Sequence, residues 1–568
     1  MALSTHETTC LFCSLCCPAG VAVDALGFVE PDYPGHTSER HRGLCFRGHY
    51  LSDLAAHASR FHEATVREGG EERQAMPAEA LRDAGRSMPN ERSATAVVVD
   101  GNATCEEILG AVRAARDGLG VQRVTIFVPP TDEAVLRGVA AGAAARLTRE
   151  SVAECDVVLA VGDPFATQPV VASPVLDALS ADRRHRLVNI DPIRGRTARY
   201  ATDFVQVAPG GEAAALAGLL MAIEGAAVPE ALNGRDIEWA AERAGVSTGA
   251  LESAARAVQD AKRLGVLVSL PEGRCAEPAA VGALAAMVAA ARGGRVLPLT
   301  IYGNAEGACR LAAALGTTPL SQLLDDVRAE TVKTLIVLGT DLLSAVPDPC
   351  LAGLDVLLAS AALPSATAER ARFVVPSSFW FEQGGTVVGG SGMRQEVAQA
   401  LSAPRGALSA VDVLVGLGAP GGVGAQDPAD DLAAQLADPP AHDLGAALGD
   451  PDQWGVAVGD GQIALLSRAD AKGFADGSLT IQLSWPALME PGPVLYVDPS
   501  AADAMGDGPA TLRRNGHALA VAVKASDDVP AGVGVLAACF PAVRPLFGCE
   551  GGPMGPGVVA LEKNRGND

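Results

Sequence analysis

The sequence predicts an α/β fold that ends in a small β-barrel. From about residue 93, β-rich runs alternate with helical stretches, a pattern typical of βαβ units and parallel sheets. Towards the C-terminus the pattern changes to short alternating strands with tight turns, which favours a barrel. We expect a Cys-rich cluster module at 1–58, an α/β core at 59–417, a Gly/Pro/Ala/Asp-rich linker at 418–475 and the barrel at 476–568.

The core is expected to form two doubly wound halves, each built on a parallel sheet. The first half is predicted to hold the strands 96–99, 124–128, 156–161 and 186–190, with a helix from about Cys105. The second half is predicted to hold the strands 266–270, 295–301, 334–338, 356–358 and 373–375. The barrel is predicted to include the strands 479–483, 494–497 and 518–523, and a helix is expected at 430–435 in the linker.

Charge and hydropathy exclude several classes of protein. The net charge of -23, with no basic stripe, argues against a nucleic-acid partner, because phosphate contacts need clustered Lys and Arg. The longest apolar stretch, 279–291, is too short to span a membrane and is expected to be a buried helix. The cysteines begin at Cys10, which leaves no room for a signal peptide, so we expect a cytoplasmic protein.

Five of the twelve cysteines lie within the first 45 residues, and this clustering indicates metal binding. Cys10, Cys13, Cys17 and the distant Cys45 provide the four thiolates that a 4Fe–4S cluster needs, one for each iron. Cys16 competes with Cys17 for the third position. A structural zinc site is the alternative, since zinc also accepts four thiolates, although its usual pattern has two C-x2-C pairs.

The same cysteines, followed by the run Gly43-Leu-Cys-Phe-Arg-Gly48, resemble the opening of the molybdopterin oxidoreductases. The resemblance is to formate dehydrogenase α subunits and the large G subunit of NADH–quinone oxidoreductase, and more distantly to the B chain type of formylmethanofuran dehydrogenase. The family has a Lys between cluster and pterin, and here Arg47 takes its place. The resemblance implies a 4Fe–4S cluster and a molybdopterin guanine dinucleotide with Mo or W.

Two motifs of the first half extend the resemblance. The run 155–164 looks like the family's strand and turn "ADVVL..G.NP", and the run 187–203 looks like "VIDPR.T.TA..AD". Such turns lie at the carboxyl ends of parallel strands, where ligands bind in open α/β sheets. The resemblance implies that one guanine nucleotide is held by Gly162, Asp163, Asp191 and Thr197. Asp191 could accept two hydrogen bonds from a guanine edge; by itself, a strand-end turn with Pro192 would be the simpler interpretation.

Three later motifs are similar to the family's "N..GA", "L.V.G.NP" and "E..GT..N.EGR.Q" elements, and they begin at residues 304, 335 and 382. Glycines in the last motif permit close approach of the backbone to a phosphate or a pterin. Runs between 497 and 532 resemble the family's dinucleotide-binding barrel, which covers the pterin from one side. The resemblance therefore implies cofactor contacts by Asn304, Gly339, Glu382, Gly385, Thr386 and Arg394.

The sequence departs from the family where a Cys or selenocysteine beside a His binds the metal. The corresponding run begins Pro129-Pro130-Thr131-Asp132 and contains neither residue; Asp132 is a weak candidate. Cys105 is another candidate, because a predicted helix N-terminus would lower its pKa, and a buried helix cysteine is the alternative. The sequence identifies no catalytic residue.

The resemblance implies a formate dehydrogenase-like oxidoreductase subunit. Electrons would pass through the cluster between a pterin site, acting on formate or another one-carbon substrate, and iron–sulfur or flavin subunits of a larger complex. One alternative is a non-catalytic electron-transfer or scaffold subunit without Mo or W, as in the G subunit of NADH–quinone oxidoreductase. Another is a fused, B/D-like form of formylmethanofuran dehydrogenase.

Overall fold

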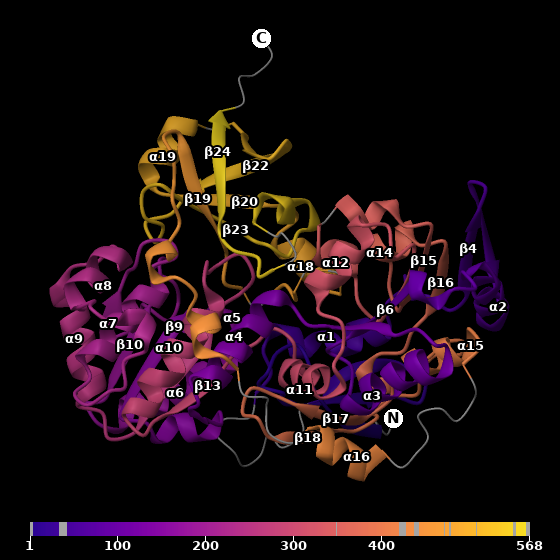
Figure 1. Cartoon of the computed structure of the whole chain (residues 1–568), viewed down its shortest axis with the longest axis horizontal. Helices are drawn as coiled ribbons and strands as arrows, with labels where there is room; N and C mark the ends of the chain where they lie inside the picture. The colour runs from indigo at the N-terminus through magenta and orange to yellow at the C-terminus, as the bar shows by residue number, and fades with distance from the viewer. Residues whose placement is uncertain are drawn as a thin grey trace. The chain divides into compact units, whose positions relative to one another are not determined.

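The computed structural model describes two compact units, each assembled from separated stretches of the chain (Figure 1). The described residues are 4–32, 43–347, 349–419, 428–436, 442–470, 472–475, 477, 479–506, 508–548 and 552–563. Unit 1 comprises Met1–Val128, Tyr302–Pro440 and Asp476–Leu483, and unit 2 comprises Pro129–Ile301, Ala441–Ala475 and Ser484–Asp568.

Unit 1 is built on a seven-stranded sheet. Its strand order is β5 (Glu71–Ala75), β4 (Ala64–Glu68), β16 (Phe373–Pro376), β15 (Val356–Ala361), β14 (Thr334–Leu338), β6 (Thr95–Asp100) and β7 (Arg123–Phe127). The five strands from β16 to β7 are parallel, whereas β4 and β5 run antiparallel at one edge. All residues of β14 are buried, as expected for a parallel strand covered on both faces.

Two smaller sheets complete unit 1. Strands β1 (Ser4–Thr9), β2 (Pro18–Val23) and β3 (Val29–Asp32) form an antiparallel sheet, and β17 (Gly385–Val388) pairs with β18 (Arg394–Val397). The connection between β1 and β2 is the cysteine-rich run 10–17. The N-terminal segment is therefore more regular than its sequence suggested, and its cysteines lie on a loop between two paired strands.

Unit 2 contains a six-stranded parallel sheet and the barrel. The sheet order is β11 (Asp203–Val205), β10 (Arg186–Ile190), β9 (Val157–Gly162), β12 (Leu264–Ser269), β13 (Arg295–Pro298) and β8 (Ala145–Arg146). The core packs its strands against Ala-rich helices, including α7 (Glu212–Ala222) and α10 (Pro278–Ala291). The helix expected at 279–291 is confirmed as buried.

The C-terminal barrel is closed, which confirms the predicted architecture (Figure 1). Its order is β19 (Gln462–Ser467), β23 (Val533–Leu536), β20 (Val494–Val497), β22 (His517–Ala525), β21 (Ala510–Arg514) and β24 (Gly557–Lys563). Strand β19 lies inside the stretch 418–475 that we expected to be a linker. The predicted strand 479–483 is wrong, because the N–H groups of Thr480 and Ile481 bond to the nearby carbonyl of Gly477.

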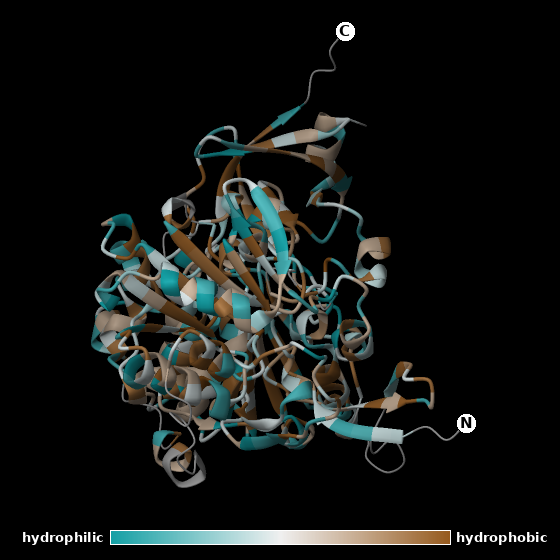
Figure 2. Cartoon of the chain, turned by 90° about the vertical axis from the view of Figure 1, so that its right-hand side faces the viewer, coloured by the Kyte–Doolittle hydropathy of each residue, from teal (hydrophilic) through white to brown (hydrophobic). Residues whose placement is uncertain are grey.

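The predicted strands of the α/β core all exist, but their grouping into sheets was wrong. The strands at 96–99 and 124–128 join those at 334–376 in unit 1, and the strands from 156 to 298 form the sheet of unit 2. Sequence order misled the assignment because unit 2 is inserted between two parts of unit 1. Figure 2 shows the strands of these sheets as mostly hydrophobic. Within the described residues, no helix has the length and hydropathy needed to cross a membrane.

Candidate functional site

The loop at residues 10–17 carries three of the predicted cluster cysteines, and hydrogen bonds fasten it at its base. The Cys10 N–H donates to the Cys17 carbonyl at 2.9 Å, which closes the loop on itself. Just before the loop, the Trp380 indole N–H donates to the Thr9 carbonyl at 3.0 Å. Both bonds are buried, so the ends of the loop are held in a defined geometry.

The middle of the loop is held by residues that lie far away in the sequence. The Leu11 carbonyl accepts from the Asn102 side chain and from the Gly303 N–H, each at 3.1 Å. The Ser14 carbonyl accepts from the Gly390 N–H at 3.0 Å. A Cβ on Gly303 would lie 2.7 Å from the Leu11 Cα, so glycine is needed for this approach. Asn102 was not singled out from the sequence, which offers no signal for its role.

The structure brings the thiols of Cys10, Cys13, Cys17 and Cys45 into one neighbourhood. Burial raises the pKa of the Cys10 thiol well above its ordinary value, and the nearby thiols of Cys17, Cys45 and Cys13 raise it further. Cys16 lies differently, because its Sγ donates to the Gly303 carbonyl at 3.3 Å. It also has a positive φ of 44°, which is unusual for a residue with a side chain.

Arg47 lies beside these thiols, at the start of helix α1 (Phe46–Ala55). Its side chain is completely buried. Burial lowers the pKa of the guanidinium, but the thiols of Cys45, Cys13 and Cys10 outweigh this and raise the pKa overall. A cation in this position would stabilise the thiolate forms that metal binding requires.

The arrangement of the four thiols bears on which metal group could fit. Among the described residues, no three Cys, His, Asp or Glu side chains are placed to hold a single metal ion. A zinc site needs its ligands around one centre. Around a 4Fe–4S cluster each thiolate binds a different iron, so the ligands stand farther apart. Four buried thiols that affect one another without converging on one point fit the cluster better than zinc.

Asn304 lies next to the cysteine loop but is engaged with protein groups. Its side-chain oxygen accepts from the Val388 N–H at 2.8 Å and from the Cys105 thiol at 3.4 Å, and its amide donates to Ala103. Burial raises the pKa of Cys105 to about 12. The expectation that a helix N-terminus would lower this pKa is therefore wrong, because burial outweighs the helix dipole.

The glycine-rich turns around β17 pack closely on other parts of unit 1. The Thr386 N–H donates to a Glu106 carboxylate oxygen at 2.7 Å, and a Cβ on Gly385 would meet that same oxygen at 2.7 Å. A Cβ on Gly389 would lie 2.6 Å from the Ser14 carbonyl of the cysteine loop. At these positions, the absence of a side chain serves contacts within the protein.

Glu382 and Arg394, from the same predicted motif, have different surroundings. Arg60 holds both carboxylate oxygens of Glu382 at 2.5 Å, and this ion pair is buried. The Phe379 N–H also donates to Glu382, at 2.8 Å. Arg394 is exposed on β18, and its guanidinium donates to the Leu432 carbonyl. Glu382 thus anchors its loop, whereas Arg394 keeps an exposed cationic group.

In unit 2, Gly162, Asp163 and Thr197 form one turn at the carboxyl end of β9. The Thr197 hydroxyl donates to Asp163 at 2.7 Å and accepts from the Phe165 N–H at 3.0 Å. Gly162 has a φ of 84°, and a Cβ there would overlap the Ser269 carbonyl of β12. Asp163 and Thr197 therefore shape the turn with their side chains.

Unit 1 contains the same turn at the carboxyl end of β14. Gly339 has a φ of 85°, and Asp341 accepts from the Thr367 hydroxyl at 2.6 Å. The Thr367 hydroxyl accepts in turn from the Leu343 N–H at 3.0 Å. The predicted residue Gly339 thus belongs to an internal structural repeat, and the Asp341–Thr367 pair in it was not foreseen from the sequence.

Asp191 is the predicted site residue whose geometry leaves most room for a ligand. It is buried at the end of β10, where one oxygen accepts from the Ile193 N–H and from Arg274. Its other oxygen is also buried and has no hydrogen-bond partner among the described residues. Burial raises the pKa of Asp191 to about 6, and Arg274 opposes the rise. Arg274 also donates to the Ser467 carbonyl on β19.

The position of the family's metal-binding cysteine lies at the start of helix α4 (Pro130–Ala141). Asp132 is buried there, and both of its carboxylate oxygens accept from the Ile301 N–H, at 3.1 and 2.9 Å. This carboxylate therefore holds the chain after β13. The structure gives Asp132 a role in the fold and no sign of a free ligand group.

The fold resembles that of a known enzyme. Acetylene hydratase from Pelobacter acetylenicus superimposes with a TM-score of 0.75 over 98% of this chain and 100% of that chain, at 13% sequence identity. No protein-family model and no curated protein matches the sequence. At this identity the likeness concerns the fold alone, and at that level it supports the resemblance to the molybdopterin oxidoreductase superfamily.

Proposed function

We propose that this chain is a subunit of the molybdopterin oxidoreductase type that transfers electrons through a 4Fe–4S cluster bound by Cys10, Cys13, Cys17 and Cys45. The observation that carries the proposal is the gathering of these four buried or half-buried thiols beside the buried Arg47. A bound cluster supplies one-electron transfer. A single cluster must pass its electrons on, so the proposed partners are iron–sulfur or flavin subunits.

The residues of this chain have separate tasks in the proposed site. The bonds to Leu11 and Ser14 hold the loop so that its thiols are already positioned before a cluster binds. Arg47 offsets the negative charge of the thiolates and of the cluster. Cys16, whose thiol is directed to the Gly303 carbonyl, stays outside the ligand set in this proposal.

We further propose that unit 2 holds a guanine nucleotide of molybdopterin guanine dinucleotide. A guanine edge carries N–H donors, and the buried, unpartnered oxygen of Asp191 is an acceptor that needs one. The turn of Gly162, Asp163 and Thr197 lies at the carboxyl end of the neighbouring strand. Asn304, Glu382, Gly385 and Thr386 would shape the loops of unit 1, and Arg394 would offer a cation.

The second candidate function is catalysis at Mo or W on formate or another one-carbon substrate, as the sequence resemblance implies. The engagement of Asp132 with the Ile301 N–H weighs against it, because the position of the usual metal ligand carries no available side chain there. A fused, B/D-like form of formylmethanofuran dehydrogenase shares this difficulty, although the C-terminal barrel agrees with that architecture.

The test of the cluster is iron and acid-labile sulfide in anaerobically purified protein, with Cys17→Ser compared to Cys16→Ser. We expect about four irons per chain in the wild type and in Cys16→Ser, and a loss of at least half in Cys17→Ser. Cys16→Ser is the matched control, since serine can still donate to the Gly303 carbonyl. Zinc in place of iron, or equal losses in both variants, would refute the ligand assignment.

The same samples decide between the two candidate functions when they are analysed for molybdenum and tungsten. Near-stoichiometric Mo or W would support a catalytic pterin centre that lacks the usual thiolate. Four irons with neither metal would support a subunit that only transfers electrons. Asp191→Asn should then lower the guanine nucleotide released on denaturation if unit 2 binds it, and an unchanged amount would contradict that role.

A further inference from the structure

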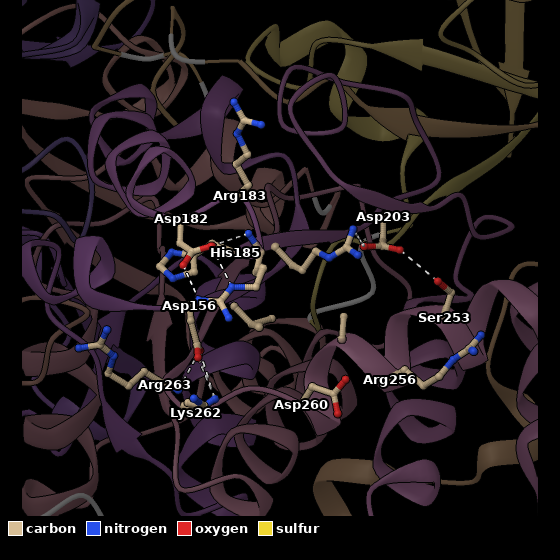
Figure 3. A pocket seen from close by; sticks show the side chains of 14 residues that line it. Asp156, Asp182, Arg183, His185, Asp203, Ser253, Arg256, Asp260, Lys262 and Arg263 are labelled. Carbon is tan, nitrogen blue, oxygen red and sulfur yellow. Dashed lines mark hydrogen bonds and ion pairs between the residues drawn. The ribbon is translucent and has the colours of Figure 1, made fainter.

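Unit 2 has a hollow of about 960 Å³ at the edge of its sheet opposite the proposed cofactor residues (Figure 3). It lies where β9, β10, β11 and β12 begin, and it is bordered by helix α9 (Thr248–Gln259). Gly162 and Asp191 lie at the other ends of β9 and β10. A strand of six residues spans about 20 Å, so the hollow is a separate site.

The lining of this hollow is unusually basic for such an acidic chain. The net charge of the protein is -23, yet six Arg or Lys and four Asp line the hollow. The lining cations are Arg183, Arg184, Arg186, Arg256, Lys262 and Arg263. Clustered cations in a concave surface raise the local concentration of anions, even where the protein as a whole repels them.

Two of the six cations are already neutralised, and four are not. Arg184 pairs with Asp182 at 2.7 Å, and Arg186 lies 3.9 Å from Asp203. The other four form no ion pair with any carboxylate in the described part of the chain; they are Arg183, Arg256, Lys262 and Arg263. All four are exposed, so their charges are available to a ligand from solution.

The acid at the floor of the hollow does not neutralise these cations. Asp156 accepts hydrogen bonds from the backbone N–H groups of Lys262 and Arg263, at 3.0 and 2.8 Å. Figure 3 shows these bonds between the Asp156 carboxylate and the chain that follows α9. Because backbone groups satisfy the carboxylate, the ammonium of Lys262 and the guanidinium of Arg263 remain without a fixed partner.

We propose that this hollow binds a small anion that carries two or more phosphate groups, such as a pyrophosphate or the phosphate chain of a nucleotide. Guanidinium groups match phosphate oxygens with paired hydrogen bonds, and Lys262 adds a compact charge. The volume lies in the range of small-ligand sites. The described lining includes no Phe, Tyr or Trp on which a base could stack, so the contacts are to the phosphates.

Calorimetric titration of the full chain with sodium tripolyphosphate at low ionic strength tests the proposal. The key variant is Arg256→Gln/Lys262→Gln, and Arg405→Gln/Lys524→Gln is a control that removes the same charge from exposed cations elsewhere. We expect saturable binding of one anion by the wild type, at least tenfold weaker binding by the key variant and less than a twofold change in the control. Added salt should weaken binding.

Three outcomes would overturn the proposal. These are no saturable binding by the wild type, equal losses in the key variant and the control, or tighter binding of citrate than of tripolyphosphate. If the key variant fails to fold, Arg183→Gln/Arg263→Gln replaces it with the same expected loss. Because the hollow shares no residue with the cysteine loop, iron content should be unchanged in every variant, so a failed cluster assignment would not alter this test.

Discussion

The carboxyl group of Glu212 is buried at the first residue of helix α7, and this burial controls its charge. Its exposed fraction is 1%. Burial raises the pKa of Glu212 from 4.5 to about 8, and nearby Asp191 adds to the rise. Glu277 behaves in the same way, with a pKa of about 8 that burial and Glu212 both raise. In the folded protein both groups therefore hold their protons near neutral pH.

This burial makes the stability of unit 2 dependent on pH. Since the folded pKa of Glu212 lies above the unfolded value, its contribution is complete below about pH 4.5 and is lost as pH rises towards 8. We expect Glu212→Gln to reduce the fall in unfolding free energy between pH 5 and pH 8 by roughly 1 kcal/mol per pH unit. Urea unfolding at several pH values measures this, and the exposed Glu252→Gln should leave the slope unchanged.

At the scale of elements, helices α4 and α10 approach so closely that their backbones touch. A Cβ on Gly138 would lie 2.0 Å from the Ala279 carbonyl oxygen, and one on Gly282 would lie 2.5 Å from the Val135 carbonyl oxygen. Neither glycine has a positive φ, so it is the space between the helices that requires them. The many alanines of both helices serve the same close packing.

Even one added methyl group should force this helix pair apart. We expect Gly282→Ala to lower the free energy of unfolding by about 1–3 kcal/mol, because the neighbouring backbone cannot yield cheaply. Gly249→Ala in helix α9 is the matched control, since its Cβ would meet nothing within 4 Å. That control should be neutral or stabilising by up to about 1 kcal/mol. Equal effects of the two changes in denaturant unfolding would contradict the close-packing argument.

At the scale of the whole molecule, the two units have separate cores although the chain passes between them several times. All residues that clasp the cysteine loop belong to unit 1: Asn102, Gly303, Trp380 and Gly390. The Asp191–Arg274 pair and the polyanion hollow belong to unit 2. Loss of a cluster should therefore act first on unit 1.

Hydrogen exchange on cluster-loaded and cluster-depleted protein checks this expectation. We expect faster exchange after depletion in the peptides 8–23, 301–306 and 386–392, because they contain the loop and the backbone that holds it. Strands β9, β10 and β12 of unit 2 should exchange at the same rates in both samples. A uniform increase across both units would show that the cluster stabilises the entire chain.

The secondary structure of this protein was largely predictable from its sequence. Parallel strands such as β6 and β14 are runs of buried apolar residues between polar turns, and local hydropathy is enough to find them. The strand predicted at 479–483 failed because local hydrogen bonds to Gly477 replaced the ladder of a sheet. Strand β19 was missed because the composition around it is typical of a linker.

The candidate site was predictable only in part. The spacing of Cys10, Cys13 and Cys17 identified a loop rich in metal ligands, because chelation needs closely spaced thiols. No local pattern could show that Glu382 is neutralised by Arg60, which lies 322 residues away in the sequence, or that Asp191 meets Arg274. Such partners become visible only when the fold brings them together.

The sequence by itself determined the elements of this protein and the cysteine loop, because hydropathy period and ligand spacing are local properties. Only the tertiary structure decided which strands share a sheet, since the insertion of Pro129–Ile301 separates neighbours of unit 1 along the chain. It also decided the charge states of buried groups such as Glu212, because desolvation depends on everything packed around a side chain.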